Sequence, residues 1–62
     1  MNRLLKAKII EKFGTQADFA VKARVDDPTV SRVVRNRKTL TPEDQYFWAR
    51  LLDSEPEDLF SN

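Results

Sequence analysis

The chain contains no cysteine, no histidine and no long apolar run, and its one glycine and three prolines mark places where helices begin or end. The first two absences exclude disulfides, thiolate or imidazole metal ligands, and an imidazole base. A membrane span would need about 18 consecutive apolar residues, and no secretory leader pattern opens the sequence. We therefore expect a cytoplasmic protein that is not an enzyme, with no membrane association, cofactor, metal or small-molecule substrate.

Length sets the second limit, because 62 residues make one small domain, residues 1–62. A domain of this size buries only about 60% of its unfolded surface, so one core gives it marginal stability. Small domains usually gain stability from disulfides, metals or oligomerisation. Since the first two are excluded here, self-association is expected.

Charge is divided along the chain although the net charge is only +1. Residues 1–38 carry ten Lys and Arg against four Asp and Glu, a net charge of +6. Residues 39–62 carry one basic residue against six acidic ones, a net charge of −5. A basic half beside an acidic half predicts one face that binds a polyanion. Charge alone leaves open the alternative of a chance asymmetry between two solvated faces.

Apolar residues recur with helical spacing and no alternating run is long enough to indicate a strand, so the sequence predicts an all-α fold. Capping side chains open the first four helices, and a proline stands in the first turn of the last three. We expect a compact bundle of five helices over residues 3–13, 16–23, 27–35, 42–52 and 56–60, with caps at Asn2, Thr15, Asp26 or Asp27, and Thr41.

Each helix contributes one apolar stripe to the predicted core. In the first helix Leu5, Ile9 and Phe13 form the stripe, and Leu4 and Ile10 widen it. The later helices add Phe19, Ala20, Ala23, Val30, Val33, Ala49, Leu52 and Leu59.

Aromatic residues in the last two helices exceed what so small a core can hold. We assign this surplus to a dimer interface made by Tyr46, Phe47, Trp48 and Phe60. For Trp48 a place in the core and a place in the interface remain equally open.

The run T-Q-x-x-F-A-x-x-A-x-V-x-x-x-x-V-S-R-V, residues 15–33, joins a short helix, a tight turn and a second helix that ends among basic residues. It resembles the helix-turn-helix of the Cro and C-repressor (XRE-like) superfamily of phage and bacterial transcription factors, and is most similar to phage Cro-type repressors. The preceding helix and the tail LLDSEPEDLF extend the resemblance over the whole chain in outline. The resemblance implies a lambda-repressor-like DNA-binding domain in the bacterial nucleoid or in the cytoplasm of a phage-infected host.

The resemblance also implies how the residues divide the work. The second helix of the motif would lie in the major groove of a palindromic double-stranded operator, bound by a weak or DNA-induced homodimer. Base reading would fall to Asp27, Pro28, Thr29 and Arg32, with Arg32 paired to guanine O6 and N7. Contacts to the DNA backbone would fall to Thr15, Gln16, Ser31, Arg35, Asn36, Arg37 and Lys38.

Three positions depart from the family pattern. Arg24 replaces the usual glycine of the turn, where the backbone φ is positive. Val34 replaces an acidic residue that pairs with an arginine of the first helix. Asp27 and Pro28 stand where the family often has Gln, Ser or Arg, although Asp can accept from cytosine N4 and Pro can touch a thymine methyl.

The third departure supports a second hypothesis, because the carboxylate of Asp27 repels phosphate. Under this hypothesis the chain is an antitoxin-like or adaptor domain that keeps the helix-turn-helix fold and binds a protein partner through its acidic half.

Overall fold

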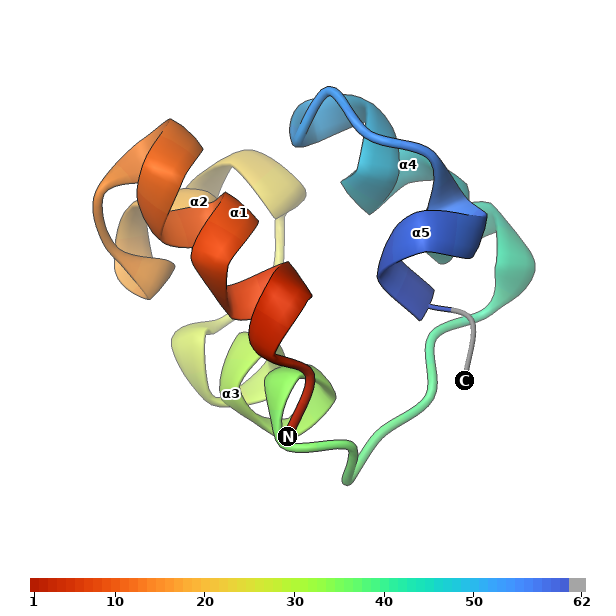
Figure 1. Cartoon of the computed structure of the whole chain (residues 1–62). Coiled ribbons are helices and arrows are strands. Elements are labelled where there is room, and N and C mark those ends of the chain that lie inside the picture. Colours follow the sequence, from red (N-terminus) through yellow and green to blue (C-terminus); the bar gives the residue numbers. More distant parts are fainter. Residues whose placement is uncertain (61–62) are drawn as a thin grey trace.

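Side-chain caps set the helix boundaries in the computed structural model, which describes residues 1–60 (Figure 1). The side-chain oxygens of Asn2, Thr15, Asp26 and Thr41 each accept a hydrogen bond from a backbone N–H three residues further on. Within residues 1–60 the helices are α1 (Arg3–Phe13), α2 (Gln16–Ala23), α3 (Asp27–Val34), α4 (Pro42–Leu51) and α5 (Pro56–Phe60).

The predicted all-α architecture of five helices is confirmed for the described residues, and residues 61–62 of the predicted domain lie outside them. Two boundaries differ from the prediction. The third and fourth helices each end one residue early, because Arg35 and Leu52 leave helical geometry and become C-caps. No helix in residues 1–60 combines the length and apolar content needed to cross a bilayer.

Figure 1 shows α1, α2 and α3 grouped on one side of the molecule and α4 with α5 on the other. Contacts of α1 with α5 and of α2 with α4 join the two groups around one core. Asn2 ties three segments together: its backbone N–H donates to the Val34 carbonyl at 2.6 Å, and its side-chain amide donates to the Leu59 carbonyl. The start of α1 is therefore fixed to the end of α3 and to α5.

An aromatic cluster occupies the centre of the core. Phe19 is 0% exposed and Trp48 is 1% exposed, and their rings meet edge to face with centroids 5.0 Å apart. Phe13 and Phe60 extend the cluster at 5.2 Å from Phe19 and 6.5 Å from Trp48. Edge-to-face packing of this kind stabilises a core beyond the area that it buries.

Leu4 and Ile10, which we expected to widen the buried stripe of the first helix, are instead 46% and 44% exposed. Only Leu5 and Ile9 are fully buried in α1. The helix is packed against neighbours along one narrow line, so the flanking apolar residues lie at the rims of surface grooves.

Left-handed backbone ends several helices. Gly14 and Asn36 have φ values of 86° and 61°, as predicted for residues that follow a helix end. Arg24, in the turn between α2 and α3, has a φ of 63°, and Asp53, which was not predicted, has a φ of 53°. A left-handed residue with a Cβ costs about 1–2 kcal/mol relative to the right-handed region.

Replacement of Arg24 by glycine is therefore expected to stabilise the protein by about 0.5–1 kcal/mol, because relief of this strain exceeds the added entropy of glycine in the unfolded chain. The midpoint of thermal unfolding, followed by circular dichroism, should rise by about 2–8 °C. Asn36→Gly is the matched control and should give a smaller rise, since asparagine tolerates left-handed backbone. A lower midpoint for Arg24→Gly would contradict the prediction.

Candidate nucleic-acid interface

The turn between α2 and α3 fixes how these two helices cross. The backbone N–H of Val25 donates to the Ala20 carbonyl at 3.1 Å, which closes α2, and the Asp26 side chain then caps α3. Ala20 and Ala23 are 3% and 5% exposed. Their small side chains lie in the core, as a close crossing of two helices requires.

The orientation of α3 separates a buried face from an exposed one. Val30, Val33 and Val34 pack into the core. Of the predicted base-reading residues, three are exposed and lie along the outer face or at the start of the helix: Asp27, Pro28 and Arg32. The fourth, Thr29, is half-buried, and its hydroxyl donates to the Asp26 carboxylate, so this hydroxyl retains only acceptor capacity for a ligand.

A groove of 370 Å³ lies where the start of α2 meets the end of α3. It brings together four of the predicted backbone-contact residues, Thr15, Gln16, Ser31 and Arg35. The groove also contains Lys6 of α1, which sequence reasoning missed. The only sequence signal for Lys6 was its position one turn before Ile10 on a basic helix. This position does not reveal which other helix lies next to Lys6 in the fold.

The groove has the chemistry of an anion site. Lys6 and Arg35 supply two positive charges, and none of the described residues that line it is acidic. The first N–H groups of α2 have no partner inside the helix and add the positive end of the helix dipole. Oxyanions bind at helix N-termini for these reasons, and the basic side chains here add charge-assisted hydrogen bonds.

The other three predicted backbone contacts lie apart from this groove. Asn36 and Lys38 border a separate small depression together with Phe60. Arg37 is exposed, and its backbone N–H donates to the Arg32 carbonyl at 2.8 Å. This bond ends α3 and directs the chain into the loop before α4.

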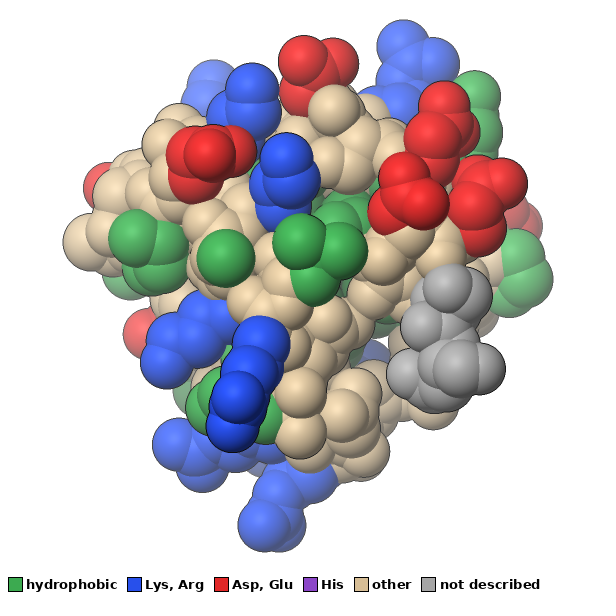
Figure 2. Space-filling model, viewed as in Figure 1, with side chains coloured by type: hydrophobic (Ala, Val, Ile, Leu, Met, Phe, Trp, Pro, Cys, Tyr) green, Lys and Arg blue, Asp and Glu red, His purple; other side chains and the backbone are tan. Residues whose placement is uncertain are grey.

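Lys and Arg side chains and Asp and Glu side chains each gather in one part of the visible face, although both kinds also occur along its upper edge (Figure 2). Figure 2 shows Lys and Arg side chains gathered at the lower left of the visible face, around α3 and the first turns of α1, and a group of Asp and Glu side chains at the upper right, over α4 and α5. The groove and the outer face of α3 thus belong to the basic side of the molecule.

The four predicted dimer residues differ in their exposure. Tyr46 and Phe47 are 56% and 38% exposed, and the Arg50 guanidinium lies 5.9 Å from the centre of the Tyr46 ring. Phe60 is half-buried. Of the two places left open for Trp48, the structure has the core, because the side chain is 1% exposed.

The carboxyl of Asp26 is more acidic than that of an ordinary aspartate. The pKa of its carboxyl lies below 3.8, chiefly because the Thr29 hydroxyl donates to the carboxylate, while desolvation opposes this effect. The Thr29 backbone N–H and the charge of Arg32 lower the pKa further. The cap of α3 is therefore strongest when Asp26 is ionised.

Acid should consequently weaken this cap. Because the folded pKa lies below the unfolded one, the stabilisation from Asp26 is complete above pH about 4 and is lost as the pH falls through the folded pKa. Asp26→Asn keeps a capping oxygen without the charge. In urea unfolding between pH about 2 and 5, the stability difference between the wild type and this variant should shrink with falling pH. A difference that does not change with pH would contradict the prediction.

Among residues 1–60, no three His, Cys, Asp or Glu side chains are grouped so as to hold a metal ion. Comparisons of the chain with protein-family models, with curated proteins and with solved structures find no match. The resemblance to the Cro and C-repressor superfamily therefore stays a prediction that depends on the residues quoted above.

Proposed function

We propose that the protein is a sequence-specific DNA-binding transcriptional regulator, of the kind found as Cro-type repressors in phages and prophages, that binds a palindromic operator as a dimer. The observation that carries the proposal is the groove beside α3. Lys6, Gln16 and Arg35 converge there on the start of α2, next to the exposed outer face of α3. An anion site next to an exposed, capped helix fits a DNA strand running past a helix that enters the major groove.

In the proposed complex the DNA phosphates position the protein. One phosphate occupies the groove, where it accepts hydrogen bonds from the α2 N–H groups and from Gln16, while Lys6 and Arg35 neutralise its charge. Ser31 and Thr15 border the same groove and offer hydroxyl donors. These contacts hold α3 at a fixed depth in the major groove but carry no sequence information.

Base reading then depends on the first half of α3. Arg32 is exposed and reaches guanine O6 and N7 with its guanidinium fork. Asp27 accepts from cytosine N4, and Pro28 makes an apolar contact with a thymine methyl. One subunit reads only a few base pairs in this way. A two-fold dimer that reads two half-sites about 34 Å apart supplies the remaining specificity.

Selection of a bound duplex from a random-sequence DNA library, followed by titration, tests the proposal. Arg32→Ala should weaken binding to the selected duplex by about 1–3 kcal/mol, which is about 5- to 150-fold, and should barely change binding to unselected duplexes. Lys22→Ala, an exposed charge of α2 outside the groove, is the control and should change neither affinity.

A failure of selection to enrich any sequence, or equal binding by wild type and Arg32→Ala, would contradict the repressor function. That result would favour the antitoxin-like or adaptor domain, which requires no contact between α3 and DNA.

A further inference from the structure

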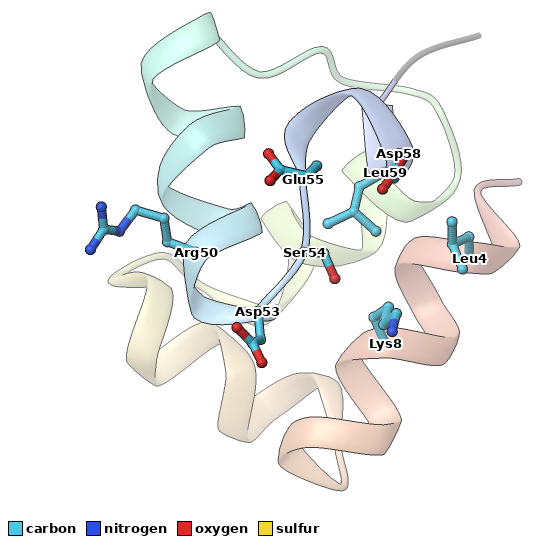
Figure 3. Close-up of a pocket in the computed structure, with 8 residues that line it drawn as sticks. All are labelled: Leu4, Lys8, Arg50, Asp53, Ser54, Glu55, Asp58 and Leu59. Atoms are coloured by element: carbon cyan, nitrogen blue, oxygen red, sulfur yellow. The ribbon is translucent and has the colours of Figure 1, made fainter.

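Another groove of the described structure lies away from α2 and α3. It has a volume of 680 Å³ and runs between α1 and the segment that joins α4 to α5. Figure 3 shows Leu4 and Lys8 of α1 on one side of the groove, and Ser54, Asp58 and Leu59 on the other. The groove therefore has two walls, one from the basic half of the sequence and one from the acidic half.

Two leucines lie among the polar residues that line the groove. Leu4 is 46% exposed at the rim, and Leu59, opposite it, is 2% exposed at the floor. Covering the exposed part of Leu4 would stabilise a complex by roughly 25 cal/mol for each Å² of apolar surface removed from water. Leu4 thus has the exposure of a contact residue rather than that of a core residue.

The two walls carry opposite charge. Lys8 lines the groove and lies 3.7 Å from the exposed Glu11, while Lys12, one turn further along α1, lies 3.8 Å from the exposed Asp53 of the opposite wall. The opposite wall carries Glu55 and Asp58. Within the part of the chain that the structure describes, neither of these two carboxylates has an ion pair or side-chain hydrogen bond. Arg50 also borders the groove, but its guanidinium points away from α1 in Figure 3.

A groove with one basic and one acidic wall is complementary to itself. Rotation by 180° about an axis along the groove brings the basic wall of one copy over the acidic wall of the other, and does so twice. The same rotation places Leu4 of each copy over the wall of the other copy that contains Leu59. We infer that the occupant of this groove is a second copy of the chain, in an isologous dimer.

This inference deepens the proposed function, on which the expectation of a dimer rests. No residue of α2 or α3 lines the groove, so the outer face of α3 and the anion site remain free for DNA in each subunit. The rival surface, Tyr46 and Phe47 on α4, lacks this two-sided charge pattern, and Arg50 already lies against the Tyr46 ring.

Sedimentation velocity over a concentration series, without DNA, tests the inference with two reciprocal variants. Lys8→Glu makes both walls acidic and Asp58→Lys weakens or reverses the acidic wall. Each variant alone should raise the dimer dissociation constant about tenfold, because the altered contact occurs twice. An equimolar mixture of the two variants should recover the wild-type association, because each restores the charge that the other lacks.

Lys22→Glu on α2 carries the same charge change outside both walls and should not weaken the dimer. An equimolar mixture of Lys22→Glu and Asp58→Lys should not recover the wild-type association. Trp48 fluorescence and circular dichroism establish that each variant is folded. Glu55→Lys reverses the same wall just before α5 and replaces Asp58→Lys if that change unfolds the helix.

Three results would overturn the inference: a wild type that stays monomeric at every concentration, a mixture that does not recover association, or a dimer that only Tyr46→Lys disrupts. Because DNA is absent, the outcome is independent of the repressor function. If the wild type stays monomeric but still selects an operator, this dimer is rejected and the repressor function is not. If the protein dimerises but selects no DNA, the repressor function is rejected and the dimer is not.

Discussion

Replacing Phe19 by alanine is expected to remove most of the stability of the protein. The Phe19 ring is 0% exposed and lies between Phe13 and Trp48, with centroid distances of 5.2 and 5.0 Å. Truncation of a buried phenylalanine costs about 3–5 kcal/mol, since the cavity it leaves collapses only in part. A domain of this length has a total stability of roughly 3–9 kcal/mol. The variant should therefore be partly or fully unfolded in water at 25 °C.

Urea unfolding followed by Trp48 fluorescence measures this loss directly, because Trp48 contacts the deleted ring. Val21→Ala is the matched control on the same helix: Val21 is 76% exposed, so its truncation should change the stability by less than about 0.5 kcal/mol. A loss below about 1 kcal/mol for Phe19→Ala would show that the aromatic cluster does not organise the core.

The starts of the helices were predictable because the capping signals that set them are local. Thr15 bonds to the N–H of Asp18 at 3.1 Å and Thr41 to that of Asp44 at 3.2 Å, and both bonds join residues three apart in sequence. These interactions need no knowledge of the rest of the fold. Left-handed geometry at Arg24 followed from the resemblance, because the family usually has a glycine of positive φ at this place in the turn.

The buried aromatic of α4 was not predictable in the same way. Tyr46, Phe47 and Trp48 are consecutive, so each points about 100° from the next around the helix, and the apolar pattern favours none of them clearly. The choice depends on where α2 places Phe19, which contacts Trp48. Lys6 was missed for a related reason: only the packing of α1 against the start of α2 and the end of α3 brings it to Gln16 and Arg35.

Salt is expected to have a large effect on the proposed DNA binding. If each subunit neutralises about four to six phosphates, the logarithm of the affinity should fall linearly with the logarithm of the salt concentration, with a slope of about −7 to −11 for the dimer. Between 50 and 200 mM salt the affinity should then fall by about 10⁴-fold or more. Fluorescence anisotropy of a labelled duplex, titrated at four or more salt concentrations, measures the slope.

The slope also tests which residues hold the backbone. Because Lys6 and Arg35 neutralise the same phosphate, the double variant Lys6→Gln/Arg35→Gln should make the slope shallower by about 1 per subunit, and each single variant by part of that change. Arg32→Ala should lower the affinity for the selected duplex with less change in slope, because its loss falls on a base contact. Lys22→Gln, outside the groove, should leave the slope unchanged. An equal change for Lys22→Gln and Lys6→Gln would mean that diffuse positive charge, rather than the groove at the start of α2, attracts the DNA.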